Sequence, residues 1–123
     1  MNHLWTYNGA EYPFDISESE SMGRMCCGLN TLRKEIGSLP ETGASDALRS
    51  QCLIIRRFFD TVLGDGCGVN VCGADYSADA HTTAYVEFIS FVNTQVNSFR
   101  EKMAALEEKY CDRAEQLEQV YGV

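Results

Sequence analysis

Residues 81–121 read HTTAYVEFISFVNTQVNSFREKMAALEEKYCDRAEQLEQVY and contain neither proline nor glycine. Large apolar side chains return along this stretch at alternating spacings of three and four residues: Ile89, Val92, Val96, Phe99, Met103, Leu106, Tyr110, Leu117 and Val120, with Arg113 the one polar occupant of the row. This spacing places one narrow apolar stripe along a straight helix. We therefore predict a single long helix that binds a partner surface along the stripe.

The two halves of this helix differ in composition. Residues 85–99 are rich in aromatic side chains, which predicts that they belong to the core beneath another helix. Residues 100–119 are strongly charged and keep large apolar residues only on the stripe. We expect this second half to project from the core and to bind a partner through Met103, Leu106, Tyr110, Leu117 and Val120. The alternative is that it folds back along the first helix.

Two shorter helices are expected to precede the long one. Ser17, followed by Glu20 three residues on, forms a capping-box pattern that predicts a first helix over about 18–36. Its apolar face would carry Met22, Met25, Cys26, Leu29, Leu32 and Ile36. Gly23 and Gly28 either permit a close helix crossing or only loosen this helix, and we favour the close crossing.

A connector over 37–44, which contains Pro40, separates the first helix from the second. Ser45 is the expected cap of the second helix, whose apolar surface is wide and therefore predicts a central position: Leu48, Cys52, Leu53, Ile54, Ile55, Phe58, Phe59 and Val62. The glycines of residues 64–73 then predict a tight reversal into the long helix. Asp60 and Asp65 beside this turn are expected to cap backbone amides.

The first sixteen residues have the pattern of a β-hairpin. Residues 3–7 and 11–16 alternate apolar and polar side chains around Asn8-Gly9, the dipeptide that best tolerates a type I′ turn. Pro13 must then lie where the ladder needs no donor. Such a hairpin serves either as a lid on the core or as an edge used in assembly. The predicted fold is mainly α: one domain with a hairpin over 1–16, a helical core over 17–99 and a projecting helix over 100–123.

Charge and hydropathy exclude several partners. The chain of 123 residues has a net charge of −8, and its nearest approach to a basic patch is Arg49, Arg56 and Arg57. Because phosphate binding needs clustered cations, we expect no nucleic-acid partner, and we expect Arg56 to pair with Asp60 one turn on. No window reaches the apolar length of a membrane span and no leader pattern is present, so we expect no membrane partner and a cytoplasmic protein.

Catalytic and metal-binding patterns are weak. His3 and His81 form no local Cys-His or Ser-His-Asp set, so we expect no catalytic residues and no enzyme. Cys67 and Cys72 have a spacing that could supply two zinc ligands, but no second pair completes four. We therefore expect no metal and no cofactor, with the six cysteines reduced and serving as packing residues or loop thiols.

Residues 47–73 resemble a known family. The run ALRSQCLIIRRFFDTVLGDGCGVNVCG contains a Phe-Phe-Asp-x-Val-x-Gly-x-Gly pattern closing on a later glycine, and residues 5–15 form a matching Trp-x-x-Asn-Gly-x-x-Tyr-x-Phe-Asp hairpin. Together they are similar to tail assembly chaperones of siphophages and prophages of Gram-positive bacteria, over roughly residues 4–95. The motif residues are Phe58, Phe59, Asp60, Val62, Gly64, Gly66 and Gly73.

The resemblance implies a non-enzymatic protein that binds a helical client, the tape-measure protein, during tail assembly in the bacterial host cytoplasm. The stripe of the long helix independently predicts binding to a helical partner and self-association into an oligomer. Two other classes of protein remain open: a helical regulatory or adaptor protein, and a structural component of the virion, which would need a richer β content than this sequence has.

Overall fold

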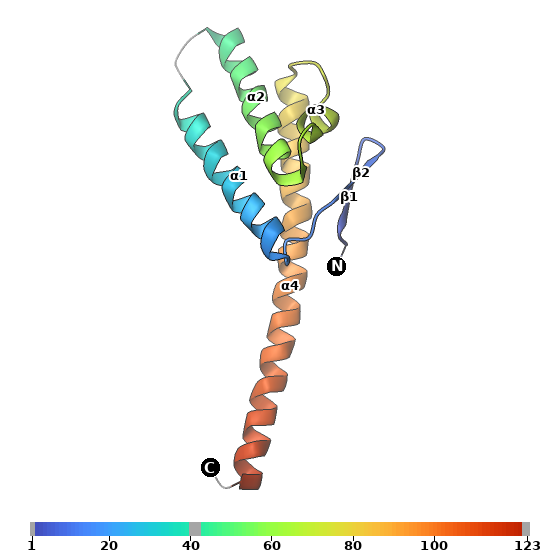
Figure 1. The fold of residues 1–123 in the computed structure, drawn as a ribbon, viewed down its shortest axis with the longest axis vertical. Helices are drawn as coiled ribbons and strands as arrows, with labels where there is room; N and C mark the ends of the chain where they lie inside the picture. The colour runs from blue at the N-terminus through green and yellow to red at the C-terminus, as the bar shows by residue number, and fades with distance from the viewer. Residues whose placement is uncertain (1, 40–42, 122–123) are drawn as a thin grey trace.

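The computed structural model describes residues 2–39 and 43–121, with side chains described as far as residue 110. A hairpin of β1 (Leu4–Tyr7) and β2 (Ala10–Pro13) is followed by α1 (Ser19–Gly37), α2 (Ala44–Leu63), α3 (Cys67–Cys72) and α4 (Ala78–Tyr121). The predicted fold, with three principal helices of which the last is the longest, is confirmed (Figure 1). The short helix α3 was not predicted. It occupies the glycine-rich stretch in which we expected only a reversal of the chain.

The hairpin has the predicted turn and register. Asn8 and Gly9 have φ angles of 49° and 78°, as a type I′ turn requires. Tyr7 pairs with Ala10 and Leu4 with Pro13, which puts Pro13 in a non-hydrogen-bonded pair, and the adjacent Phe14 N–H donates to the His3 carbonyl. Pro13 therefore costs the ladder no donor, as the sequence predicted.

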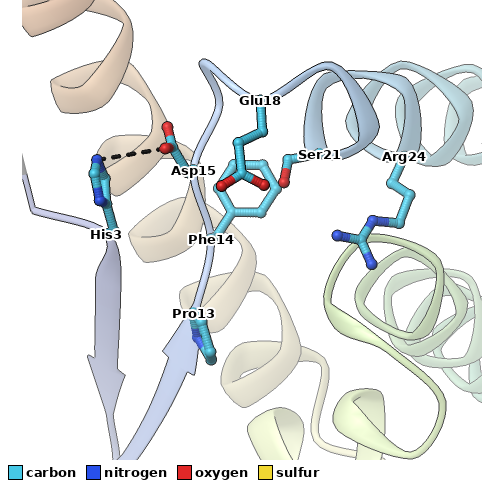
Figure 2. Close-up of a pocket in the computed structure, with 7 residues that line it drawn as sticks. All are labelled: His3, Pro13, Phe14, Asp15, Glu18, Ser21 and Arg24. Atoms are coloured by element: carbon cyan, nitrogen blue, oxygen red, sulfur yellow. Dashed lines mark ion pairs between the residues drawn. The ribbon is translucent and has the colours of Figure 1, made fainter.

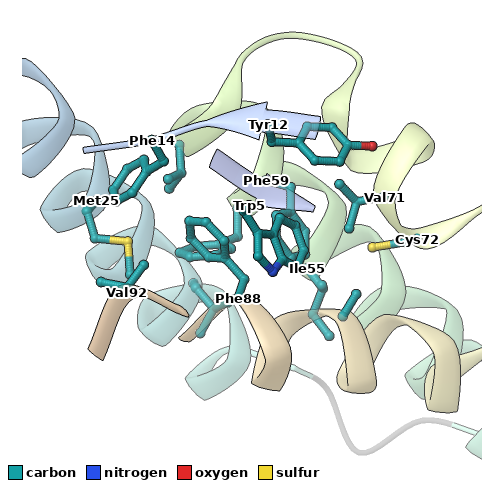
Figure 3. Close-up of a cluster of buried hydrophobic side chains, with 14 of the residues drawn as sticks. Trp5, Tyr12, Phe14, Met25, Ile55, Phe59, Val71, Cys72, Phe88 and Val92 are labelled. Carbon is teal, nitrogen blue, oxygen red and sulfur yellow. The ribbon is translucent and has the colours of Figure 1, made fainter. Parts of the chain in front are cut away.

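An aromatic cluster joins the hairpin to the helices. The Trp5 ring lies 5.9 Å from the Phe59 ring of α2 and 5.0 Å from the Phe88 ring of α4, measured between centroids. Figure 3 shows these side chains meeting between the strands and the helices. A two-stranded sheet alone is marginal in water, so this contact is what holds the hairpin in place. Of the two roles considered for the hairpin, covering the core is therefore confirmed.

Helix α2 is central, as its wide apolar surface predicted. It packs against α1 on one side and against α3 and α4 on others (Figure 1). Its buried side chains form one broad face of the helix: Cys52, Ile54, Ile55, Phe58, Phe59 and Val62. Leu48, which we expected on the buried side, is exposed near the start of the helix.

Helix α1 packs through a face that overlaps only partly with the predicted one, at Met25, Leu29 and Leu32. Its buried residues are Ser21, Met25, Gly28 and Leu32, whereas Met22, Cys26 and Ile36 are exposed. Gly28 explains why α1 turns this face toward α2. A Cβ at Gly28 would lie 2.8 Å from Val62 Cγ2 of α2, so only glycine allows this close approach. The close crossing is confirmed at Gly28. At Gly23 nothing would lie within 4 Å of a Cβ, so that glycine has no such role.

Both predicted helix caps are wrong. The N-cap of α1 is Glu18, which makes no side-chain cap hydrogen bond; Ser17 lies one residue earlier, and its hydroxyl donates to Asp15 Oδ1 at 2.6 Å. In α2, Gly43 is the N-cap residue and Ser45 already lies within the first turn. Helix α4 does have a serine cap: Ser77 Oγ accepts from the Ala80 N–H at 3.2 Å.

Candidate partner-binding surface

The N-terminal part of α4 contributes one face to the hydrophobic core. His81, Ala84, Phe88, Val92 and Gln95 are buried and follow one another at helical spacings of three and four residues. We call this row the core seam. The core seam and the predicted stripe differ by one residue at this point. The stripe contained Ile89, which is only half-buried, whereas the core seam contains Phe88, which is fully buried.

Beyond the core seam, α4 continues past the hairpin, α1 and α2 as an uncovered helix (Figure 1). Every side chain described from residue 99 to residue 110 is exposed. Phe99, which we expected in the core, is 41% exposed, because the last core contacts before it are one turn earlier, at Gln95 and Val96. We call residues 100–121 of α4 the projecting segment.

Three of the five predicted partner-binding residues lie in the described part of the projecting segment. Met103 is 40% exposed, Leu106 48% and Tyr110 69%. The side chains of Leu117 and Val120 lie outside the described residues. Phe99, Met103, Leu106 and Tyr110 follow Val92 and Gln95 at spacings of three and four, so the exposed row continues the core seam on the same face.

The residues of the predicted family motif lie in the last turns of α2 and in the connections on either side of α3. Phe58, Phe59 and Val62 are core side chains, and Gly64, Gly66 and Gly73 all have positive φ angles. Asp60 Oδ1 accepts from the Gly68 N–H at 2.7 Å, near the start of α3. The expected capping role of Asp60 is thus confirmed, whereas Asp65 has an exposed side chain.

Gly68 shows why this turn needs glycine inside a helix. A Cβ at Gly68 would lie 2.3 Å from the backbone oxygen of Arg56, so α3 rests directly on the backbone of α2. This packing also fixes Cys67 and Cys72 at the two ends of α3. Burial raises the pKa of the Cys72 thiol to about 12, with the Arg56 charge acting in the opposite direction. At neutral pH Cys72 is therefore a protonated thiol and a poor nucleophile.

Arg56 connects α2 to the segment that leads into α4. Its Nη2 donates to the carbonyls of Gly73, Ala74 and Asp75, and its Nε donates to His81 Nε2 at 3.0 Å. The expected pair with Asp60 is wrong, because four acceptors from the loop and α4 surround the guanidinium instead. Arg49 and Arg56 also lie 4.6 and 4.5 Å from the Tyr76 ring centroid, and Arg57 pairs with Glu35, so all three arginines of the predicted basic patch have partners within the molecule.

His81 is fully buried at the top of the core seam. Its Nδ1 lies 2.6 Å from the Ser77 carbonyl, and its Nε2 accepts from Arg56, an arrangement that suits the neutral ring with a proton on Nδ1. Burial lowers the pKa of His81 below its ordinary value, and the nearby Arg56 charge lowers it further, while the Ser77 hydrogen bond raises it. The ring has a structural role that joins α2 to α4.

Gln95 is a buried polar residue that the sequence analysis missed. Its Oε1 accepts from the Ile16 N–H at 2.9 Å, and its Nε2 donates to the carbonyls of Phe14 and Asn2 at 2.6 and 2.7 Å. These bonds attach the chain on both sides of the hairpin to α4. The available signal was a polar residue between Val92 and Phe99, on the face that the stripe predicts to be buried.

A polar pocket lies next to this attachment (Figure 2). It has a volume of about 210 Å³ and is lined by His3, Pro13, Phe14, Asp15, Glu18, Ser21 and Arg24. His3 Nε2 lies 3.5 Å from Asp15 Oδ2, and the hydrogen bond from Ser17 lowers the pKa of that carboxyl below its usual value. The pair fastens the start of β1 to the segment before α1, and Figure 2 shows Glu18 and Arg24 facing the same hollow.

Across residues 2–39 and 43–110, no three His, Cys, Asp or Glu side chains lie close enough together to hold a metal ion. In the same part of the chain all five cysteines are free, with Cys26 and Cys27 exposed; Cys111 lies outside the described side chains. No helix in the described part of the chain has the length and apolarity to cross a membrane.

These features define a mainly helical protein whose longest helix ends in an uncovered segment. The chain belongs to a family of unknown function, DUF6673, whose pattern matches residues 8–119. The match extends from the hairpin turn through α1, α2 and α3 into the projecting segment. No curated protein and no solved structure matches the chain.

Proposed function

We propose that this protein is a non-enzymatic assembly protein that binds a helical client along the projecting segment of α4. The observation that carries the proposal is the exposed row of Phe99, Met103, Leu106 and Tyr110, which continues the core seam beyond the last core contact. A helix that shows one apolar row and charged flanks gains stability by packing that row against a second helix. The client would cover the exposed row of the projecting segment, as the core covers the core seam in the N-terminal part of α4.

The resemblance to tail assembly chaperones suggests what the client is. We propose a long, helical tape-measure protein, bound in the bacterial host cytoplasm while a phage tail is assembled and released afterwards. The acidic surface, with a net charge of −8, suits a chaperone that must keep a client soluble and let it go again. Self-association through the same row is the second form of partner binding that these residues support.

A double substitution on the row tests the proposal. Met103→Asp with Leu106→Asp should abolish co-purification with a co-expressed tape-measure protein from the same phage or prophage, because each carboxylate would be buried unpaired in the interface. The matched control is Ala104→Asp with Ala105→Asp, which adds the same charge to the same helix turn at positions off the row. The control should retain the client.

The outcome distinguishes the interpretations. Because Met103 and Leu106 are exposed, the double variant should unfold at nearly the wild-type temperature, and circular dichroism checks this. If the client is retained by both variants, the row is not the binding surface. If the wild-type chain never retains the tape-measure protein but sediments as an oligomer that the row variant loses, the row serves self-association instead.

A further inference from the structure

The two edges of the hairpin differ in their capacity to accept another strand. On the outer edge of β2, Pro13 has no N–H to offer and Glu11 adds a charge. Both features disfavour pairing with a further strand at this edge. The outer edge of β1 consists of Leu4 and Thr6, which are uncharged and lie opposite these same two residues. The protein therefore blocks one edge and leaves the other open.

The register shows which backbone groups the open edge presents. Leu4 pairs with Pro13 and Thr6 with Glu11 in non-hydrogen-bonded pairs, so the backbone N–H and C=O groups of Leu4 and Thr6 point away from β2. The Leu4 N–H is accepted by Asn2 Oδ1 at 3.0 Å. For the Thr6 N–H and the carbonyls of Leu4 and Thr6, the described residues provide no partner.

A cleft lies along this open edge. It has a volume of about 360 Å³ and is formed by β1 on one side and by an exposed face of α4 on the other. The strand side contributes Asn2, Leu4, Trp5 and Thr6, and the helix side contributes Glu87, Ser90, Phe91 and Thr94. The Leu4 side chain is 42% exposed and Phe91 is half-buried, so the cleft offers apolar contact as well as backbone hydrogen bonds.

We propose that this cleft binds an extended segment of a partner protein, which adds to β1 as a third strand. Strand addition draws its affinity from main-chain hydrogen bonds and its specificity from the pockets that alternate side chains enter. Glu87 is the charged group of the cleft, and the chain as a whole is strongly acidic. The segment that fits is therefore apolar at alternating positions and carries a lysine or arginine opposite Glu87.

This site is separate from the exposed row of the projecting segment, and the two can be tested independently. The probe is a synthetic peptide of about six residues, alternating valine and threonine with one threonine replaced by lysine, and capped at both ends. We expect saturable changes in the amide NMR signals of residues 4–6 and 87–94. The same peptide with N-methylated valines, which cannot donate those hydrogen bonds, should not bind.

The chain offers a matched pair of site variants. Thr6→Pro removes the outward N–H of the open edge and should weaken peptide binding at least about tenfold. Glu11→Pro makes the same change to the cross-strand partner, on the blocked edge, and should leave binding unchanged. Ser90→Trp, which fills the cleft from the helix side without touching the ladder, should also prevent binding, whereas Asn93→Trp on a neighbouring exposed face should not.

The proposal is overturned if the peptide gives no saturable binding at millimolar concentration, or if its signals map elsewhere. Equal loss of binding in the Thr6→Pro and Glu11→Pro proteins would assign the effect to hairpin folding, and Ser90→Trp would then decide whether the cleft matters. A wild-type dimer that only Thr6→Pro dissociates in sedimentation would name a second copy of this chain as the occupant and contradict the foreign segment.

Discussion

At the scale of single residues, two buried polar side chains connect elements that are far apart in the sequence. Gln95 attaches the N-terminal segment to α4 through three hydrogen bonds, and His81 joins α4 to Arg56 of α2. Buried polar groups are stabilising only when every partner is present. These positions are therefore less tolerant of substitution than the exposed residues beside them.

His81 should make stability depend on pH. Its pKa in the folded protein is lowered by burial below the ordinary value of 6.5, so the unfolded chain binds the proton more readily. The contribution of His81 to the free energy of unfolding should therefore be fully present above about pH 6.5. It should be lost as the pH drops through the interval between the unfolded and folded pKa values. Urea unfolding between pH 7.5 and pH 5 measures this, as a shift of the midpoint.

The control for this prediction is His81→Gln, which keeps an acceptor for Arg56 but does not titrate. Its unfolding midpoint should change less over the same pH interval. The pKa of Asp15 is lowered in the folded protein. Its contribution to the free energy of unfolding is therefore lost only as the pH falls below the ordinary pKa of 3.8 and through the folded pKa, so the effects of His81 and Asp15 occur in different pH ranges. An equal pH dependence in the wild type and the variant would show that another group is responsible.

At the scale of elements, glycines decide how the helices approach one another. Gly28 allows α1 to cross closely over Val62 and Phe58, and Gly68 allows α3 to rest on the backbone of α2. Gly23 lies in the same helix as Gly28 but faces open space. The two glycines of α1 therefore form a natural comparison between packing and helix propensity.

We predict opposite effects for alanine at the two positions. Gly23→Ala should stabilise the protein by about 0.5–1 kcal/mol, because alanine is the better helix former and meets no neighbour. Gly28→Ala should destabilise it by about 1–3 kcal/mol, because the new methyl group would lie 2.8 Å from a stiff, buried valine side chain. Denaturant titration of both variants measures the difference, and a stabilised Gly28→Ala protein would contradict the close crossing.

At the scale of the whole molecule, α4 passes from a packed core to an uncovered rod. Its upper part is enclosed by the hairpin, α2 and α3, while the described side chains from 101 to 110 are all exposed (Figure 1). Local stability follows buried contacts, so the two parts of one continuous helix should open independently.

Hydrogen exchange tests this division. In the isolated monomer, the amide protons of residues 100–110 should exchange at least about a hundredfold faster than those of residues 84–92, because no tertiary contact protects them. Added client, or self-association at higher concentration, should slow the exchange of the projecting segment alone. Uniform protection along α4 at high dilution would mean that the segment is covered within the monomer.

The sequence by itself determined the features that depend on local chemistry and periodicity. The Asn8-Gly9 turn, the place of Pro13, the three long helices and the central position of α2 follow from backbone preferences and from the spacing of apolar residues, which act within a few residues. The uncovered end of α4 was predicted in the same way, from the change in composition after Phe99.

The tertiary structure alone decided which side chains meet across long sequence separations. Ser17 was expected to cap a helix but is bound by Asp15, and Arg56 was expected to pair along its helix but binds the loop before α4. The buried role of Gln95 depends on the hairpin lying against α4, some eighty positions later in the chain. The face of α1 and the formation of α3 depend on how closely two backbones approach, a distance that no periodicity encodes. Such choices are made by packing, because a polar group binds the partner that the assembled core brings near it.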